Sequence, residues 1–527
     1  MNDAVIVGSG PNGLVAANIL ADAGWDVIVL EAEPDPGGAV RSAEILPGHV
    51  YDRFSAFYPL AAVSPALRAL SLEDHGLRWA RAPLVVAHPF LDGRCAILSV
   101  DSLATAASVE AFSPGDGQAW LDLLERWRSV SAVIIDALLG PFPPTGAALR
   151  LLARSGLHEA IRTTRFALLP VRRMAEETFS GIGAAMLLGG NALHADLSPE
   201  ESLSGLFGWM LASIGQQFGY PVPEGGSGAL TAALVRRLAS RGGRVECGRR
   251  VSGIEIRSGV ASGVRTEDGG LLPARRAVLA DVSAPSLYFQ LVGRERLPSA
   301  FVDDLEHFAF DDATFKIDWV LDGPVPWTCV EAASAGTIHL ARDMDHLTIV
   351  AAQLATGTIP ADPYVIFGQS TVADPTRAPA GRHVTWAYTH VPQHVRGDAG
   401  GDLKGLWDAS ETQAFADRIE TRIEAYAPGF RDRIVVRRIT SPYDLEDADA
   451  NLVNGALNGG TSALWQQLIF RPVPGLGRPE TPIKNLYLAS ASAHPGGGVH
   501  GACGANAARA ALAGDRRRRV TAPASAL

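Results

Sequence analysis

The 527-residue sequence has little cysteine, no long apolar run and no excess of basic residues. Its four cysteines, Cys95, Cys247, Cys329 and Cys503, form no CxxC pair and no spacing typical of a metal site. We therefore expect reduced thiols and no bound metal, as in a reducing compartment. No window approaches the roughly 18 uninterrupted apolar residues of a membrane-spanning helix. The N-terminus lacks the basic segment and longer apolar run of a signal peptide, so we expect a cytoplasmic protein.

The acidic charge balance argues against one large class of functions. The formal net charge is −10 and the pI is about 5.7, whereas nucleic-acid binding requires a basic face. We therefore expect no nucleic-acid partner. The hydrophobic fraction of 47% is enough to bury a large core. The length exceeds the usual size of one domain, which predicts two sequential or intertwined domains. The sequence leaves the oligomeric state open, a homo-oligomer included.

The opening stretch DAVIVGSGPNGLVAANILADAGWDVIVLEAE combines the parts of a dinucleotide-binding unit. A short β-branched run predicts a buried parallel strand, a GxGxxG motif follows it, and a helix leads to a second strand that ends in an acid. The glycines permit a tight turn, a close approach of the pyrophosphate and close helix packing, while the acid can accept hydrogen bonds from a ribose. The candidate cofactor residues here are Gly8, Gly10, Pro11, Gly13, Glu31 and Ala32.

A second glycine pair follows the acid and bears on which dinucleotide is bound. Gly37 and Gly38 permit another close backbone approach, and Arg41, with Ser42 beside it, can neutralise phosphate charge. This arrangement resembles the start of the FAD-binding glutathione-reductase-like superfamily, in its amine-oxidase and phytoene-desaturase branch. The resemblance implies that the cofactor is FAD.

Later segments match the same branch in the same order. PVPEGGSGALTAALVRRLASRGGRVECGRRVSGIEI predicts a glycine turn, a helix and two strands, and in the resembling family the backbone at the position of Val251 contacts the adenine. KNLYLASASAHPGGGVHGACGANAARAAL resembles the C-terminal signature of the phytoene-desaturase and carotenoid-isomerase-like flavoproteins, as LHADLSP and LWQQLIFRPVPGLG resemble two further motifs. The resemblance assigns flavin contacts to Ser490, Gly498 and Val499. Ser490 and Ser492 replace glycines that are common there, which the backbone tolerates if φ stays negative.

These matches imply an α/β fold in which a discontinuous Rossmann-like FAD-binding domain holds an inserted α+β substrate domain. The predicted FAD-binding domain comprises 1–75, 221–290 and 475–515, and the substrate domain 76–220 and 291–474.

Two runs in the second insert and the end of the chain carry separate expectations. The runs HLTIVAAQ and HVTWAYTHV are rich in β-branched and aromatic residues and predict strands of a sheet. The arginine-rich end, residues 516–527, predicts a disordered tail.

Four polar residues are candidates for the chemistry. His494 and His500 flank the glycine loop expected to face the flavin, where either could donate a hydrogen bond or move a proton. His494 could instead only pack the turn before Pro495. Arg471 could orient a substrate oxygen or tie the two domains together through a salt bridge. His194 could line the substrate cavity or belong to a polar loop at a helix end.

The leading hypothesis is an FAD-dependent oxidoreductase that desaturates a small lipophilic or polyene-like substrate by hydride transfer to flavin N5. No second complete GxGxxG is present, so the electrons would leave to oxygen, a quinone or another carrier. The alternatives are a flavin-dependent polyene isomerase, an amine oxidase and an interaction module with weak or no FAD. The absence of lysine between Lys316 and Lys404 disfavours the amine oxidase. Stretch 141–174, with several arginines and leucines, is either a peripheral membrane contact or an ordinary surface helix.

Overall fold

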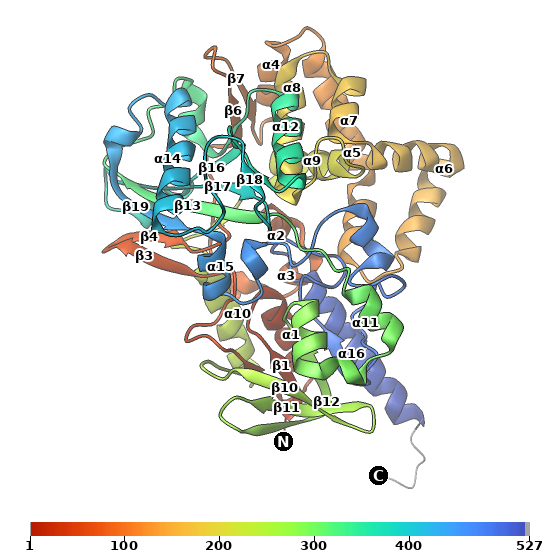
Figure 1. Cartoon of the computed structure of the whole chain (residues 1–527). Helices are drawn as coiled ribbons and strands as arrows, with labels where there is room; N and C mark the ends of the chain where they lie inside the picture. The colour runs from red at the N-terminus through yellow and green to blue at the C-terminus, as the bar shows by residue number, and fades with distance from the viewer. Residues whose placement is uncertain (1, 522–527) are drawn as a thin grey trace.

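The structure, a computed structural model, describes residues 2–521 and contains two seven-stranded sheets, one above the other in Figure 1. The lower sheet has the order β10-β11-β12-β1-β2-β9, with β20 beside β12. Strands β9, β2, β1, β12 and β20 pair in parallel, whereas β10 and β11 are antiparallel. Its strands are β1 (Asn2–Val7), β2 (Val27–Leu30), β9 (Arg244–Glu246), β10 (Val251–Arg257), β11 (Val260–Thr266), β12 (Leu271–Ala280) and β20 (Leu486–Leu488).

Three distant parts of the chain therefore build one sheet. Each part lies in one of the three segments expected to bind FAD. The exact domain boundaries stay a prediction. Because β1, β12 and β20 run in parallel, their carboxyl ends bring Gly8, Asp281 and Ala489 to the same edge, where ligands of such sheets bind. The associated helices are α1 (Pro11–Asp22), α10 (Gly228–Ser240), α11 (Ser299–Leu305), α16 (Ala502–Thr521) and the π-helical η3 (Ser286–Gly293).

Close packing of α1 holds the glycine loop in place. All six residues of β1 are buried: Val5 and Val7 face one core cluster, Ala4 and Ile6 the other. α1 packs against α10 and α16. At Gly504 of α16 an added Cβ would lie 1.8 Å from the Asn12 carbonyl oxygen, so these two helices can touch only because residue 504 is glycine.

The upper sheet draws its strands from both predicted inserts, in the order β19-β13-β17-β16-β14-β6-β7. Only the β14–β6 pair is parallel among the pairs of this sheet that the structure describes. Its strands are β6 (Leu84–Pro89), β7 (Cys95–Leu98), β13 (Ala313–Leu321), β14 (Ala335–Leu340), β16 (Val365–Gln369), β17 (His383–Val391) and β19 (Ile434–Thr440).

Side-chain alternation gives this sheet two buried faces. Val86 and Trp386 pack into a cluster with the helical layer, whereas Ala87 and Ala387 pack with α14 (Ala409–Tyr426) on the other face. The helical layer, which includes the projecting α6 (Figure 1), consists of α4 (Ser102–Glu110), α5 (Asp116–Leu139), α6 (Thr145–Leu168), α7 (Val171–Thr178), α8 (Ile182–Ala192), α9 (Ser204–Phe218) and α12 (Met344–Ala355).

Short elements connect the two sheets. The paired strands are β3 (Ser42–Leu46) with β4 (His49–Asp52), β5 (Trp79–Ala80) with β8 (Val222–Pro223), and β15 (Thr358–Ile359) with β18 (Gly397–Asp398). The short helices are α2 (Pro59–Val63), α3 (Pro65–Arg68), α13 (Ser370–Ala373) and α15 (Pro442–Ala448). The 3₁₀ turns are η1 (Leu72–His75), η2 (Leu193–Ala195), η4 (Arg294–Arg296), η5 (Val330–Ser334), η6 (Pro375–Arg377), η7 (Arg431–Arg433), η8 (Val453–Gly455), η9 (Leu464–Gln466) and η10 (Leu468–Phe470).

One of the two predicted strands is wrong. HVTWAYTHV forms β17 as expected, but HLTIVAAQ lies within the helix α12. The Asp343 carboxylate accepts a hydrogen bond from the backbone N–H of His346 and caps this helix. Met344, Leu347 and Val350 recur every three residues and form its buried face. This helical period outweighs the strand propensity of the β-branched residues between them.

The predicted disorder of the tail also fails for the part that can be checked. α16 continues to Thr521, and the Arg518 guanidinium binds the Arg276 carbonyl oxygen at 3.1 Å. Alanine-rich sequence and this contact extend the helix beyond residue 515. Residues 522–527 lie outside the described residues. Between residues 2 and 521, no helix combines the length and apolarity needed to cross a bilayer.

Candidate active site

A cavity of about 320 Å³ joins the carboxyl edge of the lower sheet to one face of the upper sheet. Its glycine-loop side is lined by Gly10, Pro11, Asn12, Gly38, Ala39, Asp281, Ser283, Asp449, Asn451, Ser490, Ala491, Ser492, Gly498 and Val499. Its other side is lined mainly by Phe54, Ala56, Phe57, Tyr58, Leu60, His194, Asp196, Leu211, Tyr220, Thr314, Lys316, Thr337, Trp386, Tyr388, His390, Leu445, Leu452, Leu457 and Asn458. Predicted cofactor loops and the largely apolar substrate part thus share one space.

The two N-terminal glycine motifs meet at this cavity. Gly8 turns the chain with φ +90° after β1, and α1 begins with Pro11 at its first position. An added Cβ at Gly38 would lie 3.0 Å from Gly10 Cα. The absence of side chains here opens a cradle at the N-terminus of α1, whose unpaired N–H groups and positive dipole end favour phosphate.

Asp281 closes the back of this cradle. Its carboxyl oxygen Oδ2 accepts a hydrogen bond from the Gly13 N–H at 2.7 Å. Burial raises the pKa of Asp281 to about 8, although the Gly13 N–H opposes the shift. At neutral pH the group is therefore mainly protonated, so it adds little negative charge beside a bound pyrophosphate.

Glu31, which the sequence predicts to bind a ribose, directly follows β2 and does not line the cavity formed by the described residues. Its carboxylate accepts hydrogen bonds from Ser9 N–H (2.9 Å), the Ser9 hydroxyl (2.5 Å) and Glu33 N–H (3.0 Å). A carboxylate has about four acceptor sites, so these partners from the described chain leave one for a ribose hydroxyl. The Arg249 N–H binds the Glu31 carbonyl oxygen at 2.7 Å, which places the strand that starts at Val251 beside this acid.

Arg41 and Ser42 bind protein groups. The Arg41 guanidinium donates to the carbonyl oxygens of Gly38 (2.8 Å) and Ala448. The Ser42 hydroxyl accepts from the Gly228 N–H at 2.9 Å and so ties β3 to the second glycine turn. Of the predicted cofactor residues, Gly10, Pro11, Gly38, Ser490, Gly498 and Val499 line the cavity that the described residues enclose. The others do not line it: Gly8, Gly13, Glu31, Ala32, Gly37, Arg41, Ser42 and Val251.

The serines that replace expected glycines fit the loop. Ser490 and Ser492 both line the cavity, and neither has a positive φ. The Ser492 hydroxyl donates to the Gly459 carbonyl oxygen at 2.8 Å, which satisfies its polar group. With the open cradle and the remaining acceptor on Glu31, these features fit bound FAD.

Neither histidine of the glycine loop lines the cavity formed by the described residues. The His494 ring lies 3.2 Å from the Gly140 carbonyl oxygen and 5.8 Å from the Phe142 ring centroid. The His500 Nδ1 accepts from the Ala502 N–H at 3.0 Å, so its Nε2 donates to the Gly497 carbonyl oxygen. Burial lowers the pKa of both rings to about 4. Gly498 and Val499, between them, do line the cavity.

Arg471 is fully buried and braces the loops behind the cavity. Its guanidinium donates to the backbone carbonyl oxygens of Asn458, Gly460, Thr461 and Ala491. No carboxylate among residues 2–521 pairs with it, so the salt bridge considered from the sequence is not formed. Burial lowers the pKa of Arg471 to about 10.

The upper sheet adds a polar group that sequence reasoning missed. His390 Nε2 lies 2.9 Å from the Asp196 carboxylate, which also accepts a hydrogen bond from the Asn458 amide at 2.7 Å. Burial alone would lower the pKa of His390, but the Asp196 carboxylate outweighs it and raises the pKa to about 9. The alternation Trp386, Tyr388, His390 in HVTWAYTHV was the available signal, because alternate residues share one face of a strand.

His194, a predicted substrate residue, is uncharged at neutral pH, unlike His390. Its ring lies 2.9 Å from His339 Nε2 and 3.3 Å from the Tyr388 hydroxyl. Burial lowers the pKa of His194 to about 4, and the charge of His390 adds to the effect. The cavity therefore holds a neutral imidazole and an imidazolium at neutral pH.

Lys316 also lines the cavity, on β13. Its ammonium group donates to the Asp52 carbonyl oxygen at 3.0 Å and to the Asp318 carboxylate. Asp52 is in turn paired with the fully buried Arg377 at 2.7 Å. This buried network links the β3–β4 hairpin to the upper sheet and fixes one wall of the cavity.

The glycine cradle opens into a cavity that one face of the upper sheet also lines. This is the arrangement of an FAD-dependent oxidoreductase. The model of the family described as flavin containing amine oxidoreductase matches residues 12–301, and this chain belongs to that family. Its cofactor is FAD.

The proteins that this chain resembles carry different names. The chain is 31% identical to pyridine nucleotide-disulfide oxidoreductase domain-containing protein 2 of Mus musculus, covering 96% of this chain and 92% of that protein. It is 26% identical to a lycopene-forming phytoene desaturase of Pseudescherichia vulneris, covering 97% and 99%. Among solved structures, a triple mutant of putrescine oxidase has a TM-score of 0.62 at 18% identity over 98% and 99% of the two chains, which supports the fold.

Proposed function

We propose that the chain desaturates a lipophilic, polyene-like substrate. The main evidence is a largely apolar chamber that is continuous with the glycine cradle. Phe57, Leu60, Leu211 and Trp386 line this chamber. Bound FAD supplies a hydride acceptor at N5. These side chains would hold a hydrocarbon and exclude water from the reacting carbon atoms. The electrons would then pass to oxygen, a quinone or another carrier.

We assign proton handling to the two histidines of the chamber. The Tyr388 hydroxyl, which lines the chamber, can accept the proton that leaves when the substrate loses a hydride and pass its own proton to Nδ1 of neutral His194. His339 holds the other ring nitrogen of His194. His390, already protonated through Asp196, keeps a positive charge in the chamber instead of acting as a base. Opposite pKa shifts of neighbouring groups are a common way to separate such roles.

The relatives support this proposal unevenly. Those named as phytoene desaturases cover most of the chain at about a quarter identity, whereas the mouse relative carries no substrate in its name. Isomerisation of a polyene without net oxidation and oxidation of an amine use the same fold. These reactions differ in their products, so the product decides between them.

The test uses the purified flavin-containing protein without oxygen. A polyene presented in detergent micelles should bleach the flavin absorption and give a product lighter by two hydrogen atoms. Product of unchanged mass would favour the isomerase, and bleaching by amines alone would favour an amine oxidase. Protein that contains no flavin and does not bind added FAD would refute all three and leave the interaction module. Re-oxidation by air or by a soluble quinone then identifies the acceptor.

We also propose that α6 contacts a membrane through its apolar residues. Leu149, Leu157 and Ile161 are 60–68% exposed, an unusual state for large apolar side chains unless they meet a partner. The arginines of 141–174 contribute less than the sequence suggests, because Arg150 pairs with Asp136 and Arg165 with Glu177 at 2.7 Å. A lipophilic substrate would be drawn from the same bilayer.

Vesicle sedimentation tests this contact. Replacing Leu149, Leu157 and Ile161 together by serine should reduce binding to phosphatidylglycerol vesicles by at least about 100-fold, since each buried leucine or isoleucine contributes roughly 1.5–3 kcal/mol. Leu271→Ser, at a leucine of β12 that is 49% exposed, is the matched control and should bind like the wild type. Equal binding of all three proteins would refute the contact.

A further inference from the structure

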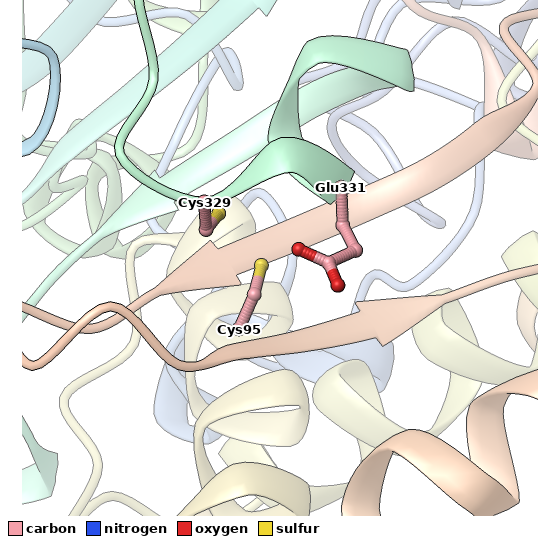
Figure 2. Close-up of side chains that lie close together, drawn as sticks. All are labelled: Cys95, Cys329 and Glu331. Atoms are coloured by element: carbon pink, nitrogen blue, oxygen red, sulfur yellow. The ribbon is translucent and has the colours of Figure 1, made fainter.

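Two cysteines and a glutamate, distant in the sequence, come together at the edge of the upper sheet. Cys95 begins β7, the last strand in the sheet order, while Cys329 precedes η5 and Glu331 lies within it. In Figure 2 all three side chains point toward one another across the gap between η5 and the strand. The two sulfur atoms and a carboxylate oxygen lie within 4.8 Å of one another.

The charges of this group are poorly balanced. The two sulfur atoms lie beside the Glu331 carboxylate. Among residues 2–521, no lysine, arginine or histidine forms an ion pair with Glu331 that would offset this negative charge.

We propose that Cys95, Cys329 and Glu331 bind a thiophilic divalent cation, Zn²⁺. Two thiolates and a carboxylate are zinc ligands, and thiolates disfavour the hard ions Mg²⁺ and Ca²⁺. Glu331 is exposed, so water can complete a tetrahedral site. Binding releases the thiol protons, because zinc is bound by thiolates.

The position indicates what the ion does. Cys329 packs in the core cluster on the α14 face of the sheet, whereas Trp386 and Tyr388 belong to the face that lines the cavity. The ion would therefore fasten the connection between β13 and β14 to the edge strand β7, remote from the flavin. This role is structural, since none of the three residues lines the cavity of the described chain.

Zinc-edge X-ray absorption of the flavin-containing protein, loaded with one equivalent of Zn²⁺ under reducing conditions, reads the ligands directly. We expect two sulfur scatterers at about 2.3 Å and lighter scatterers at about 2.0–2.2 Å. The Cys95→Ser variant should show one sulfur and bind Zn²⁺ at least about 100-fold more weakly in a chelator competition. Glu331→Gln, at an exposed position that should not disturb folding, should keep both sulfurs and lose about tenfold in affinity.

Cys247→Ser is the matched control, because Cys247 is a partly buried cysteine of the lower sheet region. It should keep the wild-type spectrum and affinity. Zn²⁺ should raise the Tm of the wild type and of this control, but not that of Cys95→Ser. A site without sulfur, or equal losses in Cys247→Ser and Cys95→Ser, would overturn the proposal. So would a Cys95–Cys329 disulfide that persists under the loading conditions.

Discussion

Replacing Gly13 by alanine tests the glycine cradle most directly. An added Cβ at this position would lie 2.3 Å from the Gly8 carbonyl oxygen, where ordinary contacts begin at 3.4 Å. The two atoms would overlap by about 1 Å, and the obstacle is backbone. Either α1 must move away from β1 or the turn must open, and both changes move the N–H groups that face the cavity.

The magnitude follows from the packing. Forcing one extra carbon into a well-packed site costs about 1–3 kcal/mol. Because 1.4 kcal/mol corresponds to a factor of ten, the affinity for FAD should fall by about 5-fold to 150-fold if the strain is relieved at the cradle. If the strain remains in the fold, the same free energy appears as lower stability toward urea.

The assay is fluorescence titration of flavin-depleted protein with FAD, with urea unfolding of the same samples. Gly146→Ala is the matched control, since Gly146 also lies in the first turn of a helix and an added Cβ there meets no atom within 4 Å. The control should bind FAD like the wild type and gain up to about 1 kcal/mol of helix stability. Wild-type affinity and stability in Gly13→Ala would refute the cradle.

Three further measurements probe the interior. The pKa of His390 is raised to about 9, so its pairing with Asp196 stabilises the fold fully at pH values below the unfolded pKa near 6.5. This stabilisation is lost as the pH rises through 9. In urea unfolding at different pH values, Asp196→Asn should abolish this pH dependence, which amounts to up to about 3 kcal/mol. Arg471→Lys should lower the free energy of unfolding by about 2–4 kcal/mol, because a single ammonium cannot satisfy all the buried carbonyl groups that this guanidinium binds. In turnover assays His194→Gln should lower kcat by about 100-fold, whereas His494→Gln, outside the cavity, should retain most of it.

The cofactor part of the fold is predictable from sequence because its constraints are local. The turn at Gly8 must connect a buried strand directly to a helix. Few sequences other than a strand-forming run, GxGxxG and a helix-forming run meet this requirement. Even in this part, the sequence could not show that the Arg41 guanidinium would donate hydrogen bonds to the carbonyl oxygens of Gly38 and Ala448 rather than to phosphate. The second of these contacts depends on a partner 407 residues away.

The substrate part is harder because tertiary packing outweighs local propensity. HLTIVAAQ has the β-branched content of a strand, yet its residues Leu347 and Val350 recur with helical spacing and pack onto α8. The glycine-loop histidines illustrate the same limit. Their spacing around Gly498 places them close to the cavity, but only the backbone path determines that both rings bind carbonyl oxygens on its outer side.

Strand register links the fold to the proposed chemistry. In β17 Tyr388 lies opposite Lys316 and His390 opposite Thr314 of β13, and all four line the cavity. A shift of one residue would turn Tyr388 and His390 into the α14 core and present Ala387 and Thr389 to the substrate. The apolar face behind β17, with Ala387 against α14, therefore determines which titratable groups reach the cavity. Residues that touch no substrate can thus control activity by holding this register.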